Sequence, residues 1–164
     1  MGYNKFADFI NSQKIVAENT NAGLSLYISK EKDKKYDIST NYNPSYNFQK
    51  ISKIGYFTHQ FGVDATVYYK KVWSVGTNYD LNIRQKTAQI PGITNNLWNA
   101  RLQRTFKKDE FTVYFLVRDI LNQNIGVDRN FFSTSFTETR NDRLKRYWML
   151  GFTWNFKNKA TKAK

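Results

Sequence analysis

The segment at residues 146–156 restricts the fold of this chain more than any other stretch. Its residues alternate strictly, and every second one is a large apolar side chain: Trp148, Leu150, Phe152, Trp154 and Phe156. A period of two residues is the pattern of a β-strand with one apolar face. In water, an edge strand with so aromatic a face would promote aggregation, whereas in a membrane barrel the same face would meet lipid.

The same alternation recurs in six earlier segments, so the sequence predicts an all-β fold without helices. The predicted strands cover residues 22–30, 36–43, 57–69, 73–84, 98–106, 111–118 and 146–156. Pro44 is expected to end the second strand because proline cannot donate a hydrogen bond to a ladder. Residues 1–20 show no sustained period and are predicted to be a loop or the end of a preceding strand. The predicted architecture is therefore an antiparallel meander of about seven or eight long strands.

The predicted connections alternate in length along the chain. Those at 31–34, 70–71 and 107–109 are short, whereas those at 44–55, 87–96 and 119–144 are long. Alternate connections of a meander lie at the same end of the sheet, so all short turns fall at one end. Short periplasmic turns opposite long extracellular loops are typical of outer-membrane barrels. Within the longest connection, residues 130–137 are rich in Phe, Ser and Thr and could extend the last hairpin.

Composition narrows the possible functions. Aromatic residues make up 17% of the chain, which has no cysteine for a disulfide or a thiolate metal site. No apolar run approaches the ~18–20 residues of a membrane helix. The net charge is +13, but its cations are spread over every connection, so we expect no nucleic-acid partner. His59 is the only histidine, and no phosphate loop or nucleophile motif is present, so we predict no enzyme, catalytic residue, metal or cofactor.

The two sides of the predicted strands differ in character. The apolar side is predicted to face lipid, with Phe61, Val63, Val75, Leu81, Leu102, Val113, Phe115, Leu150 and Phe152 as its main residues. The polar side is predicted to face a lumen, where the charged candidates are Asp64, Asp80, Arg101, Arg118 and Asp119. These charges form either a structural network or a substrate path. Arg104 and His59 fall on the apolar side near strand ends, where a polar residue costs about 0–1 kcal/mol instead of about 2–4 kcal/mol at the midplane.

Two stretches near the end of the chain resemble a known family. Asp119-Ile-Leu-Asn-Gln-Asn124 and Arg146-Tyr-Trp-Met-Leu-Gly-Phe-Thr-Trp-Asn-Phe156 are similar to the C-terminal portion of Bacteroidota outer-membrane β-barrel proteins related to TonB-dependent receptors. Asn95–Ala100 and Asn11–Lys14 resemble the same family. Gly151, Trp154 and Phe156 are similar to the C-terminal signal that the outer-membrane assembly machinery recognises. The basic tail at residues 157–164 departs from this pattern.

The resemblance implies that residues 1–164 are one segment of a larger barrel in the cell outer membrane, because seven strands cannot close. It implies a signal peptide, further strands and a plug upstream of residue 1, and ligand uptake energised by a periplasmic protein. Expected partners are outer-membrane lipid, the rest of the barrel and the assembly machinery. Two alternatives stay open. One is a small closed barrel of eight strands with a structural or binding role, and the other is a soluble, basic β-barrel that acts as a binding module.

Overall fold

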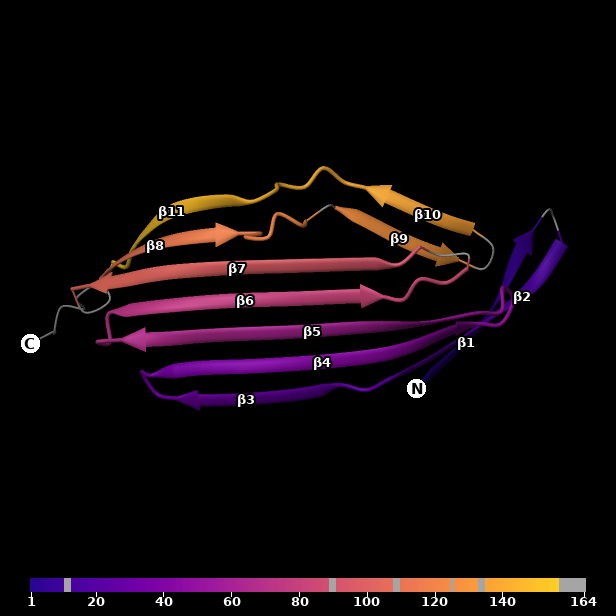
Figure 1. The fold of residues 1–164 in the computed structure, drawn as a ribbon, viewed down its shortest axis with the longest axis horizontal. Helices are drawn as coiled ribbons and strands as arrows, with labels where there is room; N and C mark the ends of the chain where they lie inside the picture. Colours follow the sequence, from indigo (N-terminus) through magenta and orange to yellow (C-terminus); the bar gives the residue numbers. More distant parts are fainter. Residues whose placement is uncertain (11–12, 89–90, 108–109, 125, 133–134, 157–164) are drawn as a thin grey trace, which may run out of the picture.

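The structure is a computed structural model that describes residues 1–10, 13–88, 91–107, 110–124, 126–132 and 135–156, without the side chains of residues 6, 8–10, 127–132 and 135–136. It is all-β, as predicted, with a nine-stranded antiparallel sheet and a separate two-stranded hairpin (Figure 1). Among the described residues, no helix has the length and hydropathy needed to cross a membrane.

The chain forms a meander in which most neighbours in sequence are neighbours in the sheet. The strands are β1 (Gly2–Ile10), β2 (Gln13–Gly23), β3 (Leu26–Lys32), β4 (Tyr36–Gln49), β5 (Ile54–Tyr69), β6 (Trp73–Arg84), β7 (Ile93–Phe106), β8 (Phe111–Arg118), β9 (Val127–Phe132), β10 (Ser135–Arg140) and β11 (Tyr147–Trp154). The large sheet has the order β1-β2-β4-β5-β6-β7-β8-β11, and β3 pairs with β4. The predicted antiparallel meander is confirmed.

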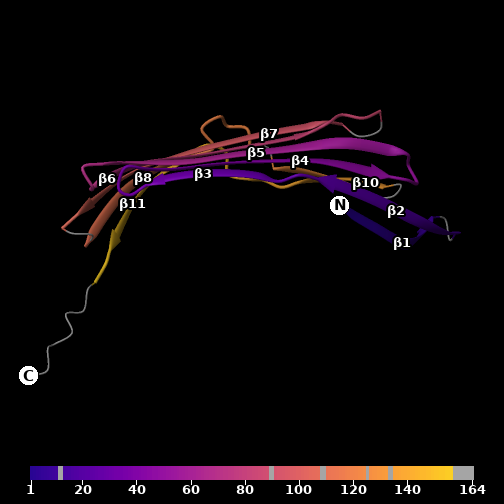
Figure 2. The same ribbon diagram turned by 90° about the horizontal axis from the view of Figure 1, so that it is seen from below.

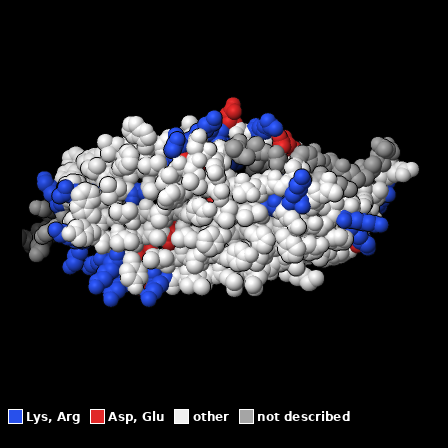
Figure 3. Space-filling view, viewed as in Figure 1, with Lys and Arg blue, Asp and Glu red and all other residues white. Residues whose placement is uncertain are grey.

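The register places apolar side chains opposite one another across the sheet. Val67 of β5 faces Val75 of β6, which faces Leu102 of β7, which in turn faces Phe115 of β8. We call this side of the sheet the apolar face and the opposite side the polar face. Figure 3 looks onto the apolar face, where Lys and Arg gather at the ends and the upper edge while the middle is largely uncharged.

The sheet is a single bowed layer with almost no hydrophobic core (Figure 2). Among the described residues, the only buried hydrophobic side chains are Ala17 and Ile54, which are 1% and 6% exposed. A soluble domain of this length would bury a core between two layers. The apolar face of this sheet therefore needs a covering that the described chain does not supply.

Pro44 does not end its strand, so that prediction is wrong. The β2 and β3 strands form one line beside β4, and the register continues from Gly23 to Leu26 without a shift. The Leu24 amide donates to the Pro44 carbonyl at 3.0 Å, but the proline nitrogen cannot return a hydrogen bond. A single ladder bond is lost at this break, and β4 continues to Gln49.

Residues 1–20 contain β1 and most of β2. The two strands pair along the whole of β1, but β2 pairs with β4 only from Asn19 onward. The β1–β2 hairpin therefore extends past the end of β4, at the right of Figure 1. Lys50 ties it to the sheet, since Lys50 Nζ lies 2.7 Å from Glu18 Oε2 and the Lys50 amide donates to the Glu18 carbonyl at 3.0 Å.

The connections at the two ends of the sheet differ, although less than predicted. At one end, hereafter the turn end, the connections are residues 33–35, 70–72 and 107–110. The other, the loop end, has 85–92 and 119–146, but also the short turn 50–53. The predicted long loop at 44–55 is thus wrong, because β4 and β5 are both longer than their apolar patterns.

The longest connection, residues 119–146, contains the hairpin β9–β10, as expected from residues 130–137. This hairpin continues the direction of β8 and β11 beyond the sheet (Figure 1). Residues 119–126 lie opposite 141–146, so the first side carries two more residues than the second. A turn at residues 119–124 takes up the difference.

Candidate functional site on the polar face

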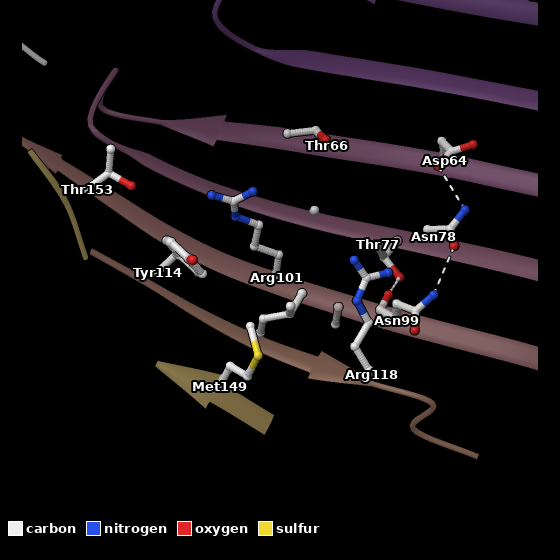
Figure 4. Close-up of a pocket in the computed structure, with 13 residues that line it drawn as sticks. Asp64, Thr66, Thr77, Asn78, Asn99, Arg101, Tyr114, Arg118, Met149 and Thr153 are labelled. Carbon is white, nitrogen blue, oxygen red and sulfur yellow. Dashed lines mark hydrogen bonds between the residues drawn. The ribbon is translucent and has the colours of Figure 1, made fainter. Parts of the chain in front are cut away.

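A shallow hollow of about 490 Å³ lies on the polar face over β5, β6, β7, β8 and β11. Figure 4 views it from the side opposite to that of Figure 1, so β5 now lies above β8. Asp64, Arg101 and Arg118, which are three of the five predicted lumen residues, line the hollow. Because the sheet bows around this face, the hollow lies on the inner side of the curve (Figure 2).

A line of hydrogen-bonded amides crosses the sheet at the edge of the hollow (Figure 4). Asn78 Nδ2 donates to Asp64 Oδ1 at 2.9 Å, and Asn99 Nδ2 donates to Asn78 Oδ1 at 3.0 Å. Asn99 Oδ1 accepts a hydrogen bond from the Asp119 amide at 3.1 Å. The register brings these side chains together, since Asp64 pairs with Asn78 and Asn78 with Asn99. This amide ladder links three strands and the end of β8 in addition to their backbone hydrogen bonds.

Asp119 anchors the turn that follows β8. Its side chain is buried, at 3% exposure, and its backbone has a φ of 51°, a left-handed conformation that Asp tolerates better than most residues. Asp119 Oδ1 accepts from the Gln123 amide at 2.9 Å, and Oδ2 accepts from the Asn124 amide at 3.1 Å. Such charge-assisted hydrogen bonds to backbone amides fix the shape of a turn. The structure therefore gives Asp119 a positioning role beside the hollow.

Arg146, the first residue of the terminal segment, is joined to the same turn. Its Nη1 donates to the Ile120 carbonyl at 3.3 Å, and its amide donates to Asn122 Oδ1 at 3.2 Å. The Ile120 amide in turn donates to the Trp98 carbonyl of β7 at 2.8 Å. The two stretches that carried the family resemblance thus meet in space and connect β7, β8 and the start of β11.

Arg101 stacks on an aromatic ring inside the hollow. Its Cζ lies 4.5 Å from the centroid of the Tyr114 ring, a cation–π distance. Tyr114 pairs with Gly151 of β11 and lies so close to it that a Cβ at Gly151 would overlap the ring. Gly151 therefore provides the space for Tyr114. Its predicted part in an assembly signal, like that of Trp154 and Phe156, stays a prediction.

The other predicted lumen residue, Asp80, lies on the polar face opposite Gly62 but outside the hollow. The sequence did not lead us to select Asn78, Asn99 or Tyr114 as site residues, although their contacts hold the other side chains of the hollow in place. The sequence showed only that each of them lies on the polar side of a predicted strand. Only the register between strands shows that Asn78 and Asn99 adjoin Asp64.

The residues predicted to face lipid all lie on the apolar face by strand register: Phe61, Val63, Val75, Leu81, Leu102, Val113, Phe115, Leu150 and Phe152. In the chain as described, Val75 is 55%, Leu150 73% and Phe152 61% exposed. Large apolar side chains gathered on one exposed face mark a surface that contacts lipid or another molecule.

Aromatic rings form two bands on the apolar face. The turn-end band consists of Tyr69, Trp73, Phe106, Phe111, Trp154 and Phe156, and the loop-end band of Tyr42, Tyr46, Phe57 and His59. His59 has a partner here, because Tyr42 Oη lies 2.8 Å from His59 Nδ1. At about 3.3 Å per residue, Phe57 and Tyr69 are about 40 Å apart along β5, or about 28 Å along a membrane normal at a tilt of about 45°. This separation fits the ~25 Å apolar band of a membrane barrel.

The chemistry of the polar face is that of hydrogen bonding and charge. The amides of the ladder and the exposed guanidinium groups of Arg101 and Arg118 offer donors to a solute or a protein segment. Among the described residues, no group of three His, Cys, Asp or Glu side chains could hold a metal ion. The prediction that the chain is not an enzyme is not tested by these observations.

Comparison with known proteins agrees with this arrangement. Residues 9–154 match the model of a family described as the outer membrane protein beta-barrel family. No curated protein and no solved structure matches the chain. The family match includes β2 to β11 and thus every strand that lines the hollow. The chain belongs to the outer membrane protein beta-barrel family, and its sheet is part of a barrel of the outer membrane.

Proposed function

We propose that this chain forms the C-terminal part of the wall of an outer-membrane transporter or receptor that resembles TonB-dependent receptors and takes up a ligand by energised import. The observation that carries the proposal is the division of one bowed sheet into an outer apolar face and an inner polar face. Such a sheet suits a barrel wall that contacts lipid outside and lines a lumen inside. Arg101, Arg118 and Asp64 then face the lumen.

The open edges of the sheet support a barrel larger than this chain. Seven lines of chain lie between the aromatic bands: β2 with β3, β4, β5, β6, β7, β8 and β11. Within the described residues, β11 pairs only with β8 and β3 only with β4. Bacterial single-chain barrels have even numbers of strands and leave no edge unpaired in lipid. We place the remaining strands and the plug upstream of residue 1.

A small closed barrel of eight strands has less support. It would require β1 to cross the membrane and to pair with β11. However, β1 pairs with β2 in the hairpin that extends past the end of β4. The soluble alternative is not supported either, because the chain belongs to an outer-membrane family and its apolar face is exposed.

The difference between the ends of the sheet supports one orientation of the barrel. We place the turn end on the periplasmic side, as short turns are in outer-membrane barrels, and the β1–β2 and β9–β10 hairpins on the outer side. Phe156, which follows β11, then lies at the periplasmic end, where the assembly machinery would recognise it with Gly151 and Trp154. A source among the Bacteroidota and an energising periplasmic partner belong to the same proposal.

Solute depletion tests the uptake function without knowledge of the ligand. Cells with the gene, cells without it, and cells with the gene plus a protonophore would be grown in one rich medium, and the spent media compared by untargeted mass spectrometry. We expect at least one solute class to be consumed several-fold faster by untreated cells with the gene than by both other cultures. Equal consumption of every solute in all three cultures would contradict energised uptake.

A second comparison in the same cells tests the polar hollow. The substitution Arg118→Gln removes one of the two guanidinium groups that line the hollow. Arg143→Gln removes an exposed cation from the connection after β10 and serves as the control. If the hollow lies on the path of the solute, Arg118→Gln slows its consumption and Arg143→Gln does not. Equal rates in both variants would assign the hollow to contact with the plug instead.

A further inference from the structure

One arginine lies on the apolar face, where a barrel meets lipid. Arg104 of β7 pairs with Trp73 of β6 and with Val113 of β8, so it belongs to the row of apolar positions. Its Cζ is 5.0 Å from the centroid of the Trp73 ring and 4.6 Å from that of the Phe106 ring. Among the described residues, the guanidinium has these two ring contacts and no carboxylate partner. Near a strand end such a cation costs little compared with one at the membrane midplane, because water or a lipid headgroup can reach it.

Two lysines flank Arg104 at the same end of the sheet. Lys70 Nζ lies 5.2 Å from the Tyr69 ring centroid, and Lys107 Nζ lies 5.1 Å from the Phe111 ring centroid. Tyr69 pairs with Trp73 and Phe106 pairs with Phe111, so the rings that hold these cations are neighbours across β5 to β8. The turn-end aromatic band therefore carries a row of three cations on the lipid side of the wall.

An apolar groove begins at this row and leads toward the middle of the apolar face. It has a volume of about 240 Å³ and is lined by Leu102, Val113, Phe115 and Leu150, with Trp73, Arg104 and Phe106 at its charged end. Leu102 and Phe115 lie farther from the turn than Arg104 and its partner Val113. The groove thus has a cationic end at the membrane interface and an aliphatic floor deeper in the membrane.

We propose that this groove is a binding site for an anionic phospholipid of the periplasmic leaflet. The lipid phosphate accepts hydrogen bonds from Arg104, Lys70 and Lys107 attract its charge, and an acyl chain lies along the groove. The planar guanidinium fork matches phosphate oxygens better than a single ammonium group does. No described residue accepts a hydrogen bond from this guanidinium, so its N–H groups are available to a ligand. This inference rests on the lipid-facing orientation and the turn-end orientation given under Proposed function.

Lipid binding to the purified, detergent-solubilised full-length protein tests the site. Dioleoyl phosphatidylglycerol and dioleoyl phosphatidylcholine would be titrated separately and the bound fractions read by native mass spectrometry. For Arg104→Gln we expect the affinity for phosphatidylglycerol to fall about tenfold, the loss of one charge-assisted interaction, with little change for phosphatidylcholine. The phosphatidylglycerol affinity of Arg104→Lys should lie between those of the wild type and Arg104→Gln, since lysine keeps the charge but lacks the planar guanidinium group.

Arg101→Gln is the matched control. It removes the same charge from the same strand and also a ring contact, but on the polar face. We expect its phosphatidylglycerol affinity to stay within about twofold of the wild type, because the lipid does not reach that face. A third arm adds free glycerol 1-phosphate, which should leave the lipid in place if the acyl chain contributes to binding.

Several outcomes would overturn the site. One is unchanged phosphatidylglycerol binding in Arg104→Gln, and another is an equal loss in Arg101→Gln, which would indicate attraction by net charge alone. Displacement of the lipid by an equal concentration of glycerol 1-phosphate would indicate a soluble phosphate site. A loss of phosphatidylglycerol affinity in Arg101→Gln alone would instead indicate that the polar face contacts lipid, which would contradict the proposed function itself. If Arg104→Gln does not fold, the phosphatidylglycerol affinity of Arg104→Lys and the glycerol 1-phosphate arm test the site in its place.

Discussion

The polar and apolar faces of the β5–β8 sheet consist of alternate residues of the same strands, yet they are stabilised differently. On the polar face, side chains satisfy one another, because Asn78 and Asn99 each donate and accept within the amide ladder. On the apolar face, residues such as Val75 and Leu150 are mostly exposed and nothing in the described chain covers them. The amide ladder of the polar face is thus satisfied within the described chain, whereas the apolar face depends on its solvent, which in the outer membrane is hydrocarbon.

A charge on the apolar face should give the largest effect. Val63→Arg places a guanidinium midway between Phe57 and Tyr69 on β5, near the middle of the predicted membrane span, where it costs about 2–4 kcal/mol. Thr66→Arg places the same group on the polar face of the same strand, where water reaches it. We expect urea unfolding of the full-length protein in lipid vesicles to show a large loss of stability for Val63→Arg only. Equal losses in the two variants would remove the distinction between the faces.

The close packing of Tyr114 on Gly151 is a second feature that should stabilise the polar face. Gly151→Ala adds a methyl group that would overlap the ring and should cost about 1–3 kcal/mol. Gly76→Ala is the matched control, because the nearest atom to its new Cβ, Thr66 Oγ1, is at an ordinary 3.4 Å. The same unfolding measurement compares them. Equal stability of Gly151→Ala and wild type, combined with reduced amounts in the outer membrane, would favour the assembly-signal role.

The turn after β8 tests whether the polar face depends on its buried carboxylate. Asp119→Ala removes the acceptor of two backbone amides and should destabilise the protein by about 1–3 kcal/mol. Asp119→Asn should cost less, since its side-chain oxygen can still accept one of these bonds. Asp80→Ala removes a carboxylate that lies on the polar face outside the turn and should change stability by less than about 0.5 kcal/mol. Similar unfolding midpoints for Asp119→Ala and Asp80→Ala would contradict this role.

The smallest effect concerns the hairpin outside the two faces. The hydrogen bond from Lys50 lowers the pKa of Glu18 below the usual carboxyl value, and the same contact raises the pKa of Lys50. The contact therefore stabilises the hairpin above the unfolded carboxyl pKa and below the unfolded lysine pKa. It is lost as pH falls through the lowered pKa of Glu18, or rises through the raised pKa of Lys50.

Amide hydrogen exchange measures this effect at the Lys50 amide, which donates to the Glu18 carbonyl. We expect wild type to be slightly better protected than Glu18→Gln at neutral pH and equal to it below the lowered pKa of Glu18. Comparison at each pH removes the intrinsic pH dependence of exchange. A constant difference between the two proteins across the acidic range would contradict the assigned ion pair.

The fold was largely predictable because strands of a membrane wall have two faces of opposite character. The alternation from Phe57 to Tyr69 and from Trp73 to Arg84 placed each side chain on its observed face. The β1–β2 hairpin was not visible, because outside the apolar band nothing requires alternation and backbone pairing suffices. The prediction for Pro44 was wrong because the neighbouring line of chain is itself interrupted opposite it, between β2 and β3, so β4 tolerates the missing hydrogen bond.

The site was only partly predictable. The charges Asp64, Arg101 and Arg118 could be assigned to one face, and the structure brings them to one hollow. Their neutral partners could not be identified, because the contact of Asn78 with Asn99 depends on the register across the connection at residues 85–92. The stacking of Tyr114 on Gly151 likewise requires the pairing of β8 with β11, whose connection spans residues 119–146.

The accessibility of spin labels along a single strand tests most directly whether the sheet separates lipid from a lumen. The chain has no cysteine, so single cysteines at residues 61–66 of β5 can each carry a nitroxide spin label in the full-length protein in lipid bilayers. We predict that labels at 61, 63 and 65 relax mainly with lipid-soluble oxygen and that labels at 62, 64 and 66 relax mainly with a water-soluble nickel chelate. A uniform response along the six positions, or the opposite alternation, would contradict a wall with lipid on its apolar face and a lumen on its polar face.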